Sequence, residues 1–470
     1  MDNQRVSQTT WDPVRDNHSI AVVESRRPFA RYERALGFLL GRTDYERNVP
    51  VRYDPNTYGL MRIQALLTQV GNPHEKLRTV HIAGSKGKGS TATMLARMLE
   101  ASGYQVGLYT SPHLEDLRER ISINGKLIGK AQLVDLLNRV YTPLQQLTGR
   151  DSPTFFDIMT TLAFMHFLDN RVDLAVIETG LGGRLDSTNV IIPEVVGITS
   201  LSLDHMHQLG PTIEHIAREK AGIFKHGVPI VTSDQNPSAL NILQAQALAL
   251  KAPFAVVGRD MHYSYRHKRS REKGSYGKIC LTTETHSFEH QRVPLHGEHQ
   301  AQNCALALAL LDRLQRQGYA INKEEALRGI DSMTLPGRME MISSKPRILI
   351  DGAHNVASIR ALIQAIALHI SADSVTMIFG CNLDKDIEGM LQEIQYGADK
   401  IVFTASDSPR AVSPQSLAER YTDICGKMCQ AATNLEQAME MIHPVVGNED
   451  LICITGSFYL IGTARKLFLR

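Results

Sequence analysis

The clearest candidate for chemistry is a glycine-rich run, Gly84-Ser85-Lys86-Gly87-Lys88-Gly89-Ser90. It lies between a short apolar run at 80–83 and an amphipathic segment at 91–103. Glycines let backbone N–H groups surround a phosphate, and the positive end of a helix attracts it. A lysine can reach the outer phosphates and a serine can hold Mg²⁺. The run therefore predicts a phosphate-binding loop with these candidate contacts: Gly84, Gly87, Lys88, Gly89 and Ser90.

The spacing of this run differs from the general nucleotide-binding loop, in which a further glycine lies five residues before the Gly-Lys pair. Ile82 occupies that position here, and Gly89 separates Lys88 from Ser90. A flexible turn that binds nothing is the alternative. The phosphate-binding interpretation is favoured because a strand precedes the run and a helix follows it.

Acidic and imidazole side chains follow two further strand-like runs. Glu178 ends one run, and Asp204 and His205 follow the next. The carboxyl ends of adjacent parallel strands meet at one edge of a sheet, so these groups are expected beside the phosphate loop. Their oxygen donors would suit Mg²⁺ on a triphosphate, whereas a hydrogen-bonded structural histidine is the alternative for His205. The glycine-rich segment 179–189 is expected to be a loop over the site.

The elements that must position these groups follow from the apolar pattern. Helical spacing fills much of 29–71, where Leu60, Ile63, Leu66, Leu67 and Val70 share one face. Strand-like runs then alternate with helical stretches, which indicates a largely parallel sheet. The first set of runs is 80–83, 104–109, 173–178 and 195–200. The second set, after Pro336 and Gly337, is 347–351, 374–380, 400–405 and 451–456.

We therefore predict an α/β fold in two parts. The first is a P-loop-type, mostly parallel sheet with helices on both faces, and the second is a smaller C-terminal Rossmann-like α/β domain. The expected boundaries are a mobile N-terminal arm at 1–28, a phosphate-binding domain at 29–335 and a C-terminal domain at 336–470. The basic segment 258–278 is expected to be a solvated hairpin, with an anion-binding patch as the alternative.

Composition excludes several classes of protein. The chain has 470 residues, of which 43% are hydrophobic and 21% charged, so it is neither disordered, collagenous nor membrane-embedded. Its net charge of +2 gives no argument for coating nucleic acid. The six cysteines show no zinc-binding spacing. The polar start lacks the apolar stretch of a signal peptide, so we expect a cytoplasmic protein.

A series of motifs along the chain resembles folylpolyglutamate synthase and its bifunctional form with dihydrofolate synthase, enzymes of the Mur ligase superfamily. The resemblance spans about 30–470, and its motifs occur in the order of the family. They are VHIAGSKGKGST, YTSPHL, ERISING, PTFFD, IETGLGGRLDSTN, LDHMHQLGPTIEHIAREKAGIFK, HGEHQAQNCALAL, LPGRME, DGAHN and TGSFYLIG.

The resemblance implies an ATP-dependent ligase that joins L-glutamate to a reduced folate, to dihydropteroate, or to both, through an acyl phosphate. It implies two Mg²⁺ ions held by Ser90, Ser111, Glu178 and His205, and a carbamylated lysine at Lys220. Carbamylation would convert a cation that repels metal into an anion that helps to orient it. An unmodified surface lysine is the alternative for Lys220.

The remaining site residues also follow from the family motifs. Nucleotide contacts are implied for Asn303, Arg338 and Asp351, and catalytic roles for Lys88, Lys220 and His354. The pterin side is implied to be formed by Thr154, Phe155, Phe156, Asp157, Leu185, Asp186 and Ser187. Phe155 and Phe156 could equally be core aromatics. The implied partners are small molecules, with no nucleic acid and no membrane, and the implied state is a monomer.

This chain departs from the usual family pattern at Ser85, Lys86 and Ser187, where Thr, Asn and Ala are usual. None of these changes removes a required group, but they leave the pterin preference open. The alternatives are a cell-wall ligase of the same superfamily, a P-loop kinase or NTPase, and a noncatalytic nucleotide-binding relative. Only about 80 residues precede Gly84, too few for the separate N-terminal UDP-binding domain usual in cell-wall ligases.

Overall fold

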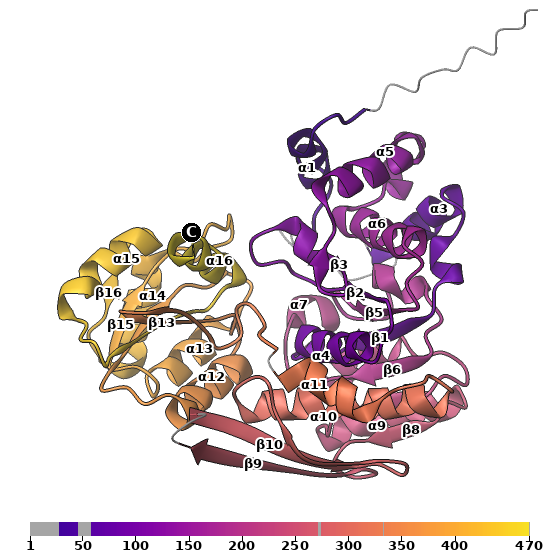
Figure 1. The fold of residues 1–470 in the computed structure, drawn as a ribbon. Helices are drawn as coiled ribbons and strands as arrows, with labels where there is room; N and C mark the ends of the chain where they lie inside the picture. The colour runs from indigo at the N-terminus through magenta and orange to yellow at the C-terminus, as the bar shows by residue number, and fades with distance from the viewer. Residues whose placement is uncertain (1–27, 46–57, 271–273, 332, 470) are drawn as a thin grey trace, which may run out of the picture.

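The computed structural model describes residues 28–45, 58–270, 274–331 and 333–469. Two lobes lie side by side, and a small antiparallel sheet runs beneath both of them (Figure 1). Residues 1–27 of the predicted N-terminal arm lie outside the described residues. In the described part of the chain, no helix is long and apolar enough to cross a membrane.

The larger, central lobe is built on an eight-stranded sheet with the order β4-β3-β2-β5-β1-β6-β7-β8. The core of this sheet is parallel, and the pairs β2–β3 and β3–β4 are antiparallel. Its strands are β1 (Thr79–Ala83), β2 (Val106–Tyr109), β3 (Ile121–Ile123), β4 (Lys126–Leu127), β5 (Leu174–Glu178), β6 (Val195–Ile198), β7 (Ile230–Thr232) and β8 (Phe254–Val256). The four strand-like runs of the sequence are thus β1, β2, β5 and β6.

Helices cover both faces of this sheet, as predicted. Their bounds are α1 (Tyr32–Leu40), α3 (Met61–Gln69), α4 (Lys88–Ala101), α5 (Lys130–Gln146), α6 (Phe155–Asp169), α7 (Met206–Leu209), α8 (Ile213–Ala221), α9 (Pro237–Ala249), α10 (Glu298–Arg316) and α11 (Lys323–Asp331). Alternate residues of one strand serve opposite faces, since Val176 packs with α4 and α10 whereas Ile177 packs with α3, α5 and α6.

The basic segment forms part of a three-stranded antiparallel sheet of β9 (His262–Ser270), β10 (Gly274–Thr282) and β11 (Ser287–Arg292). Its inner face packs against α10 through Ile279, Leu281 and Phe288. On the strands, Arg266 lies directly opposite Lys278, which lies opposite Arg292. The described residues of the segment therefore form the predicted hairpin, with β9 mostly exposed or half-buried. The anion-binding alternative stays a prediction.

The smaller lobe is built on a six-stranded sheet with the order β12-β13-β17-β14-β15-β16, parallel except for β12. Its strands are β12 (Glu340–Ser344), β13 (Arg347–Asp351), β14 (Val375–Phe379), β15 (Lys400–Phe403), β16 (Gln430–Ala431) and β17 (Leu451–Thr455). Its helices are α12 (Val356–His369), α13 (Ile387–Ile394), α14 (Pro414–Cys425), α15 (Leu435–Ile442) and α16 (Phe458–Phe468). The α/β class predicted for both lobes is confirmed. A domain boundary near 336, between α11 and β12, stays our proposal.

Candidate active site

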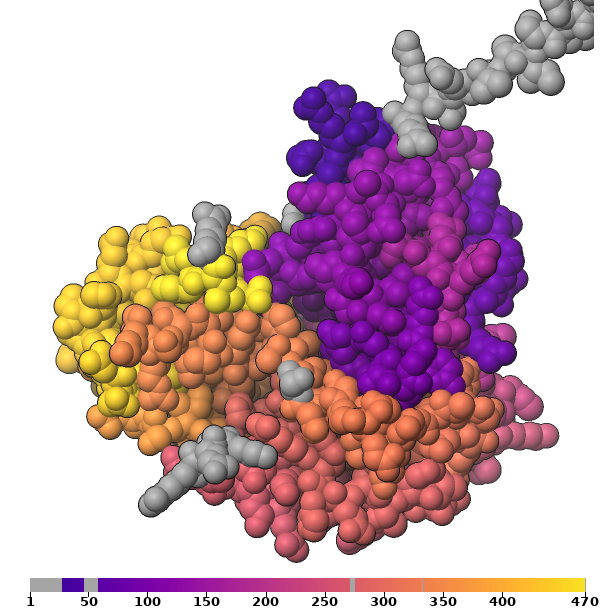
Figure 2. Space-filling model, in the orientation of Figure 1, coloured from indigo at the N-terminus to yellow at the C-terminus, as the bar shows by residue number. Residues whose placement is uncertain are grey.

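A cavity of ≈ 320 Å³ lies where the two lobes meet, and both lobes line it. Figure 2 shows the two lobes in contact, with the region of β9–β11, α10 and α11 beneath them. The wall formed by the central lobe includes the phosphate loop, the carboxyl ends of its strands and the loop after β5. The wall formed by the C-terminal lobe comes from the loops after β13, β14, β15 and β17 and from Arg338 just before β12. These predicted site residues line it: Gly84, Gly87, Lys88, Gly89, Ser111, Thr154, Phe155, Phe156, Glu178, Leu185, Asp186, Ser187, His205, Lys220, Arg338 and His354.

The phosphate loop needs glycine at two positions. Gly87 precedes α4 with a φ of 86°, and a Cβ there would lie 2.1 Å from Oδ1 of Asn303. A Cβ on Gly84 would lie 1.8 Å from Oγ1 of Thr199. The first amides of α4 have no partner within the helix. They are therefore placed to donate to an anion at the loop.

Glu178 ends β5 beside this loop and is 3% exposed. One carboxylate oxygen accepts a hydrogen bond from the backbone N–H of Ser111 at 3.0 Å, and the other lies 3.9 Å from Nζ of Lys88. Burial raises the pKa of the Glu178 carboxyl, although Lys88 and the Ser111 amide oppose this effect. A buried carboxylate that is only partly compensated favours a further cation nearby.

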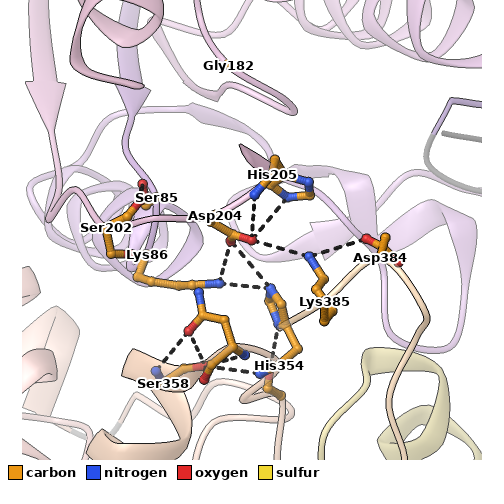
Figure 3. Close-up of polar contacts among 12 residues, drawn as sticks. Ser85, Lys86, Gly182, Ser202, Asp204, His205, His354, Ser358, Asp384 and Lys385 are labelled. Atoms are coloured by element: carbon orange, nitrogen blue, oxygen red, sulfur yellow. Dashed lines mark hydrogen bonds and ion pairs between the residues drawn. The ribbon is translucent and has the colours of Figure 1, made fainter. Parts of the chain in front are cut away.

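Asp204 joins the two lobes. Figure 3 shows its carboxylate between Lys86 of the phosphate loop and Lys385 of the C-terminal lobe. The Nζ atoms lie 2.8 Å and 3.3 Å from its two oxygens. Burial alone would raise the pKa of Asp204, but Lys86, His205 and Lys385 hold it well below its usual value. The buried acid is therefore ionised and clamped from both sides.

His354 lies beside both Lys86 and this acid, with its Nε2 3.9 Å from Oδ2 of Asp204. Its Nε2 lies 2.9 Å from Nζ of Lys86 and its Nδ1 lies 2.8 Å from the carbonyl oxygen of Gly352. Burial holds the pKa of His354 well below its usual value, and Lys86 and Lys385 reinforce the effect. The imidazole is therefore neutral at neutral pH.

Burial lowers the pKa of two further groups of this wall, His205 and Lys220. Burial lowers the pKa of His205 to about 3, so its imidazole can act as a metal ligand. Burial, with help from Lys88, lowers the pKa of Lys220 to about 7. Lys220 is 3% exposed, and its Nζ donates to the carbonyl oxygen of Gly182 at 3.4 Å.

The loop after β5 is held by one of its own acids. Asp186 accepts hydrogen bonds from the backbone N–H groups of Gly180 at 2.9 Å, Leu181 at 3.0 Å and Thr188 at 3.0 Å. A Cβ on Gly183 would lie 2.7 Å from the carbonyl oxygen of Glu219 on α8. The loop is thus closed on itself and pressed against the helix that carries Lys220.

The predicted pterin side has a similar internal support. Thr154 and Asp157 form a capping box at the start of α6, and Asp157 also accepts from Oγ of Ser187 at 2.6 Å. Phe155 is 1% exposed and belongs to the core, with the Arg120 guanidinium 5.2 Å from its ring centroid. Phe156 is less buried and packs against Tyr109 at a centroid distance of 5.9 Å. Phe156 is therefore better exposed to a ligand than Phe155.

Four predicted site residues do not line the cavity: Ser90, Asp157, Asn303 and Asp351. Ser90 is 2% exposed in the first turn of α4, and Asn303 supports Gly87 from behind. Asp351 accepts from the backbone N–H groups of Met339 and Ala353, each at 2.9 Å, which orders the turn after β13. Their proposed ligand contacts stay predictions.

Several cavity residues were not predicted from the sequence. They include three charged residues of the C-terminal lobe: Asp384, Lys385 and Arg410. The run Asp384-Lys385-Asp386 follows closely after β14, so the rule that selected Glu178 and Asp204 would have selected it too. The sequence identifies Lys86 only as a departure from the family pattern. Its partners in another part of the chain were not visible in the sequence.

Among the described residues, no three side chains of His, Cys, Asp or Glu converge in a group that could hold a metal ion. The predicted magnesium ligands are one carboxylate, one imidazole and two hydroxyls, so they do not depend on such a group. The cysteines in the described part of the chain are free thiols.

Comparison with known proteins identifies the architecture. Residues 82–311 match the Mur ligase middle domain and residues 337–458 match the Mur ligase glutamate ligase domain. A phosphate loop that shares a cavity with a second α/β lobe therefore defines an ATP-dependent ligase of the Mur type.

Individual relatives narrow the family. The Bacillus subtilis dihydrofolate synthase/folylpolyglutamate synthase is 35% identical, over 87% of this chain and 94% of its own length. The solved Mycobacterium tuberculosis folylpolyglutamate synthase complexed with ADP has a TM-score of 0.85 at 33% identity, over 93% of this chain and 98% of that one. The E. coli FolC structure in complex with DHPP and ADP has a TM-score of 0.81 at 26% identity, over 93% and 97%. The chain belongs to the dihydrofolate synthase/folylpolyglutamate synthase family.

Proposed function

We propose that this protein uses ATP to join L-glutamate to a folate, to dihydropteroate, or to both. The single observation that carries the proposal is that the phosphate loop and the C-terminal lobe line one cavity. Its relatives are named for this reaction and include ADP complexes. The pterin carboxylate attacks the terminal phosphate, ADP leaves, and the glutamate amine then displaces phosphate from the acyl carbon.

Lys88 and Arg338 are proposed to supply positive charge to the triphosphate. Lys88 lines the cavity from the central lobe and Arg338 lines it from the C-terminal side. The Arg338 guanidinium lies 4.7 Å from the ring centroid of Phe458. A carboxylate that approaches a triphosphate meets anion repulsion, so fixed cations lower the barrier to in-line transfer. Gly84, Gly87, Gly89 and Ser90 are proposed to bind phosphate through the loop and the first turn of α4. Asn303 and Asp351 are proposed as nucleotide contacts.

The residues present fit Mg²⁺. Glu178 offers a buried carboxylate, His205 a neutral imidazole, and Ser90 and Ser111 offer hydroxyls, which together form a mostly hard donor set. Two bound ions would neutralise charge on the triphosphate. The chain itself contributes the fixed position of these donors at the carboxyl edge of its sheet.

We also propose that Lys220 is carbamylated. A buried lysine whose pKa is about 7 is largely a neutral amine above that pH, and only the neutral amine attacks CO₂. The new N–C bond forms as the nitrogen loses a proton, which leaves an anion at a position where a cation would face Lys88. Carbon-13 NMR after equilibration with labelled bicarbonate would show one carbamate signal, absent in Lys220→Ala.

The two organic substrates are proposed to enter from opposite lobes. The pterin is assigned to the cavity-lining residues Thr154, Phe155, Phe156, Leu185, Asp186 and Ser187. Asp157 is assigned to the same wall as its support at the start of α6. Glutamate is assigned to the C-terminal wall near His354, where Lys385 and Arg410 provide positive charge and Asn382 has a buried Oδ1 without a partner among the described residues. We further propose that the protein acts as a monomer in the cytoplasm.

The direct test gives purified protein ATP, Mg²⁺ and labelled glutamate with dihydropteroate and with a tetrahydrofolate in parallel. ADP release should require both glutamate and one of the two pterins, and the label should appear in that pterin. A UDP-linked muropeptide serves as the control for the cell-wall ligase alternative. Release of ADP with neither pterin, or only with the muropeptide, would contradict the proposed function.

A further inference from the structure

The side chain of Lys86 leaves the phosphate loop and reaches the C-terminal lobe. Its Nζ donates to Asp204 at 2.8 Å and lies 2.9 Å from Nε2 of His354 (Figure 3). Lys88, two residues further on, has its Nζ 3.9 Å from Glu178. The two lysines of the loop therefore serve different parts of the cavity.

The central lobe sets the direction of Lys86. The backbone N–H groups of Ser85 and Lys86 both donate to the carbonyl oxygen of Ser200, at 3.0 Å and 3.3 Å. Oγ of Ser85 donates to the carbonyl oxygen of Ser202 at 3.0 Å. These bonds tie the first half of the loop to the segment that carries Asp204. Lys86 is thus held where its ammonium group meets the C-terminal lobe.

The contacts of His354 select one form of its ring. A lysine ammonium only donates hydrogen bonds, so Nε2 accepts in the contact with Lys86. A carbonyl oxygen only accepts, so Nδ1 carries the proton that is shared with Gly352. The backbone N–H of His354 also donates to Oγ of Ser358 at 3.0 Å. These contacts therefore fix both the orientation and the tautomer of the His354 ring. Lys86, from the central lobe, supplies the hydrogen-bond donor at Nε2.

We propose that Lys86 is a positioning residue that acts through His354 and so couples the phosphate loop to the docking of the C-terminal lobe. This inference rests on the proposed function, because the step it serves is the attack of glutamate on the acyl phosphate. It assigns Lys86 no direct contact with phosphate. The charge on Lys86 instead keeps one imidazole in place beside the loop.

Lys385 provides a matched control. It pairs with the same carboxylate of Asp204, at 3.3 Å, and with Asp384 at 3.6 Å. If Lys86 acted on His354 only by balancing the charge of Asp204, loss of either lysine would change the Nε2 environment of His354 in the same way. The comparison is made on this ring nitrogen and not on kcat, because Lys385 is also assigned to the glutamate wall. Loss of Lys86 alone removes the donor at Nε2 of His354.

The first measurement is nitrogen-15 NMR of histidine-labelled protein, as Lys86→Met, Lys385→Met and wild type. Lys86→Met should move the Nε2 resonance of His354, whereas Lys385→Met should leave it in place. In kinetic assays Lys86→Met should lower kcat by roughly 10-fold to 100-fold, as expected for a lost charge-assisted hydrogen bond. ADP affinity should change by less than about threefold, and Lys86→Arg should recover most of kcat.

A double-mutant cycle decides whether Lys86 acts through His354. In a His354→Ala background, Lys86→Met should lower kcat by less than about twofold further. Independent, multiplying losses would overturn the proposal, as would an ADP affinity that falls by the same factor as kcat. A wild-type protein without glutamate ligation would refute the proposed function alone, because the NMR and ADP measurements still decide the role of Lys86.

Discussion

At the scale of single residues, the glycine-rich loop depends on close contacts that leave no room for a side chain. Gly87 combines a left-handed φ of 86° with the amide of Asn303 directly beside it. Both conditions must hold for the loop to bend around an anion. Strain and steric contact therefore act at the same position.

We expect Gly87→Ala to lose nucleotide binding. The new Cβ would lie 2.1 Å from Oδ1 of Asn303, and the backbone angle would be strained as well. ADP affinity measured by calorimetry should fall by at least about tenfold, which corresponds to about 1.4 kcal/mol. Gly71→Ala is the control, because Gly71 also has a positive φ but nothing within 4 Å of its Cβ position. Equal ADP affinity in both variants would contradict the assignment of the loop.

Lys88→Ala should abolish the glutamate-dependent release of ADP and phosphate. The lysine provides positive charge where a triphosphate and a carboxylate must meet, and loss of one such group costs roughly 10²–10³ in rate. A coupled assay for ADP, with glutamate present and absent, measures the effect. If release persisted at the wild-type rate, the phosphate loop would be misassigned.

At the scale of elements, one acid organises the part of the cavity wall that we propose binds the pterin. Asp157 caps α6 and receives hydrogen bonds from Thr154 and Ser187, and it lies 3.4 Å from Nε of Arg62. Helix, loop and cation are thus joined through a single carboxylate that does not itself line the cavity. This is a supporting role that the family motif alone does not distinguish from substrate contact.

Asp157→Ala should destabilise the protein and weaken pterin binding. Buried partners left unsatisfied cost about 1–3 kcal/mol each, so we expect a loss of at least about 2 kcal/mol in the free energy of unfolding. Urea denaturation measures this, and steady-state kinetics should show a higher KM for the pterin with little change in KM for ATP. Ser187→Ala removes one of these bonds and should have a smaller effect. An unchanged KM for the pterin in Asp157→Ala would show that this acid does not support pterin binding.

At the scale of the whole molecule, function needs the two lobes to meet. In addition to the ion pairs of Asp204, a contact of Leu114 joins the two lobes. Leu114 of the central lobe packs into the C-terminal core, and a Cβ on Gly462 would lie 2.4 Å from the carbonyl oxygen of Leu114. Arg465 of α16 pairs with Glu115 of the central lobe and with Glu340 at 3.0 Å. These contacts hold one side of the cavity closed.

Arg465→Ala should loosen this closure. Surface ion pairs contribute about 0–1 kcal/mol, so we expect kcat to fall by up to about fivefold. Small-angle scattering should show a larger radius of gyration for the nucleotide-free variant. Arg360→Ala is the control, because its pair with Glu393 stays within the C-terminal lobe. A compact Arg465→Ala protein with wild-type kcat would show that the Asp204 ion pairs and the Leu114 contact hold the lobes together without this pair.

Acid should destabilise the central lobe through His81. This residue is fully buried on β1 with Nε2 2.8 Å from Oγ1 of Thr188, and burial lowers its pKa to about 3. In the unfolded chain the His81 imidazole has a pKa near 6.5. Between pH 6.5 and 3 the unfolded state therefore binds one more proton than the folded state, so the free energy of unfolding falls as the pH falls. The expected slope is up to about 1.4 kcal/mol per pH unit. His81→Gln should flatten this slope in urea titrations at pH 7 and 5, whereas His207→Gln, on an exposed helix, should not.

The sequence by itself determined the α/β class, the positions of the main strands and the phosphate loop. Those features depend on local spacing: alternating apolar runs, glycines that allow a tight turn, and acids at strand ends. The helical pattern at 29–71 is confirmed in the described residues, which form α1 and α3, with Ile63, Leu66 and Leu67 buried on one face of α3.

Only the tertiary structure decided which of these residues share a site and what each one touches. Lys86, Asp204, Lys385 and His354 come from four different loops, and the apolar pattern carries no record of how two sheets dock against each other. The same is true of Asp157 and Asp351, whose carboxylates are used by the backbone and neighbouring side chains. Contacts between distant segments depend on packing between lobes, and local sequence spacing does not encode that packing.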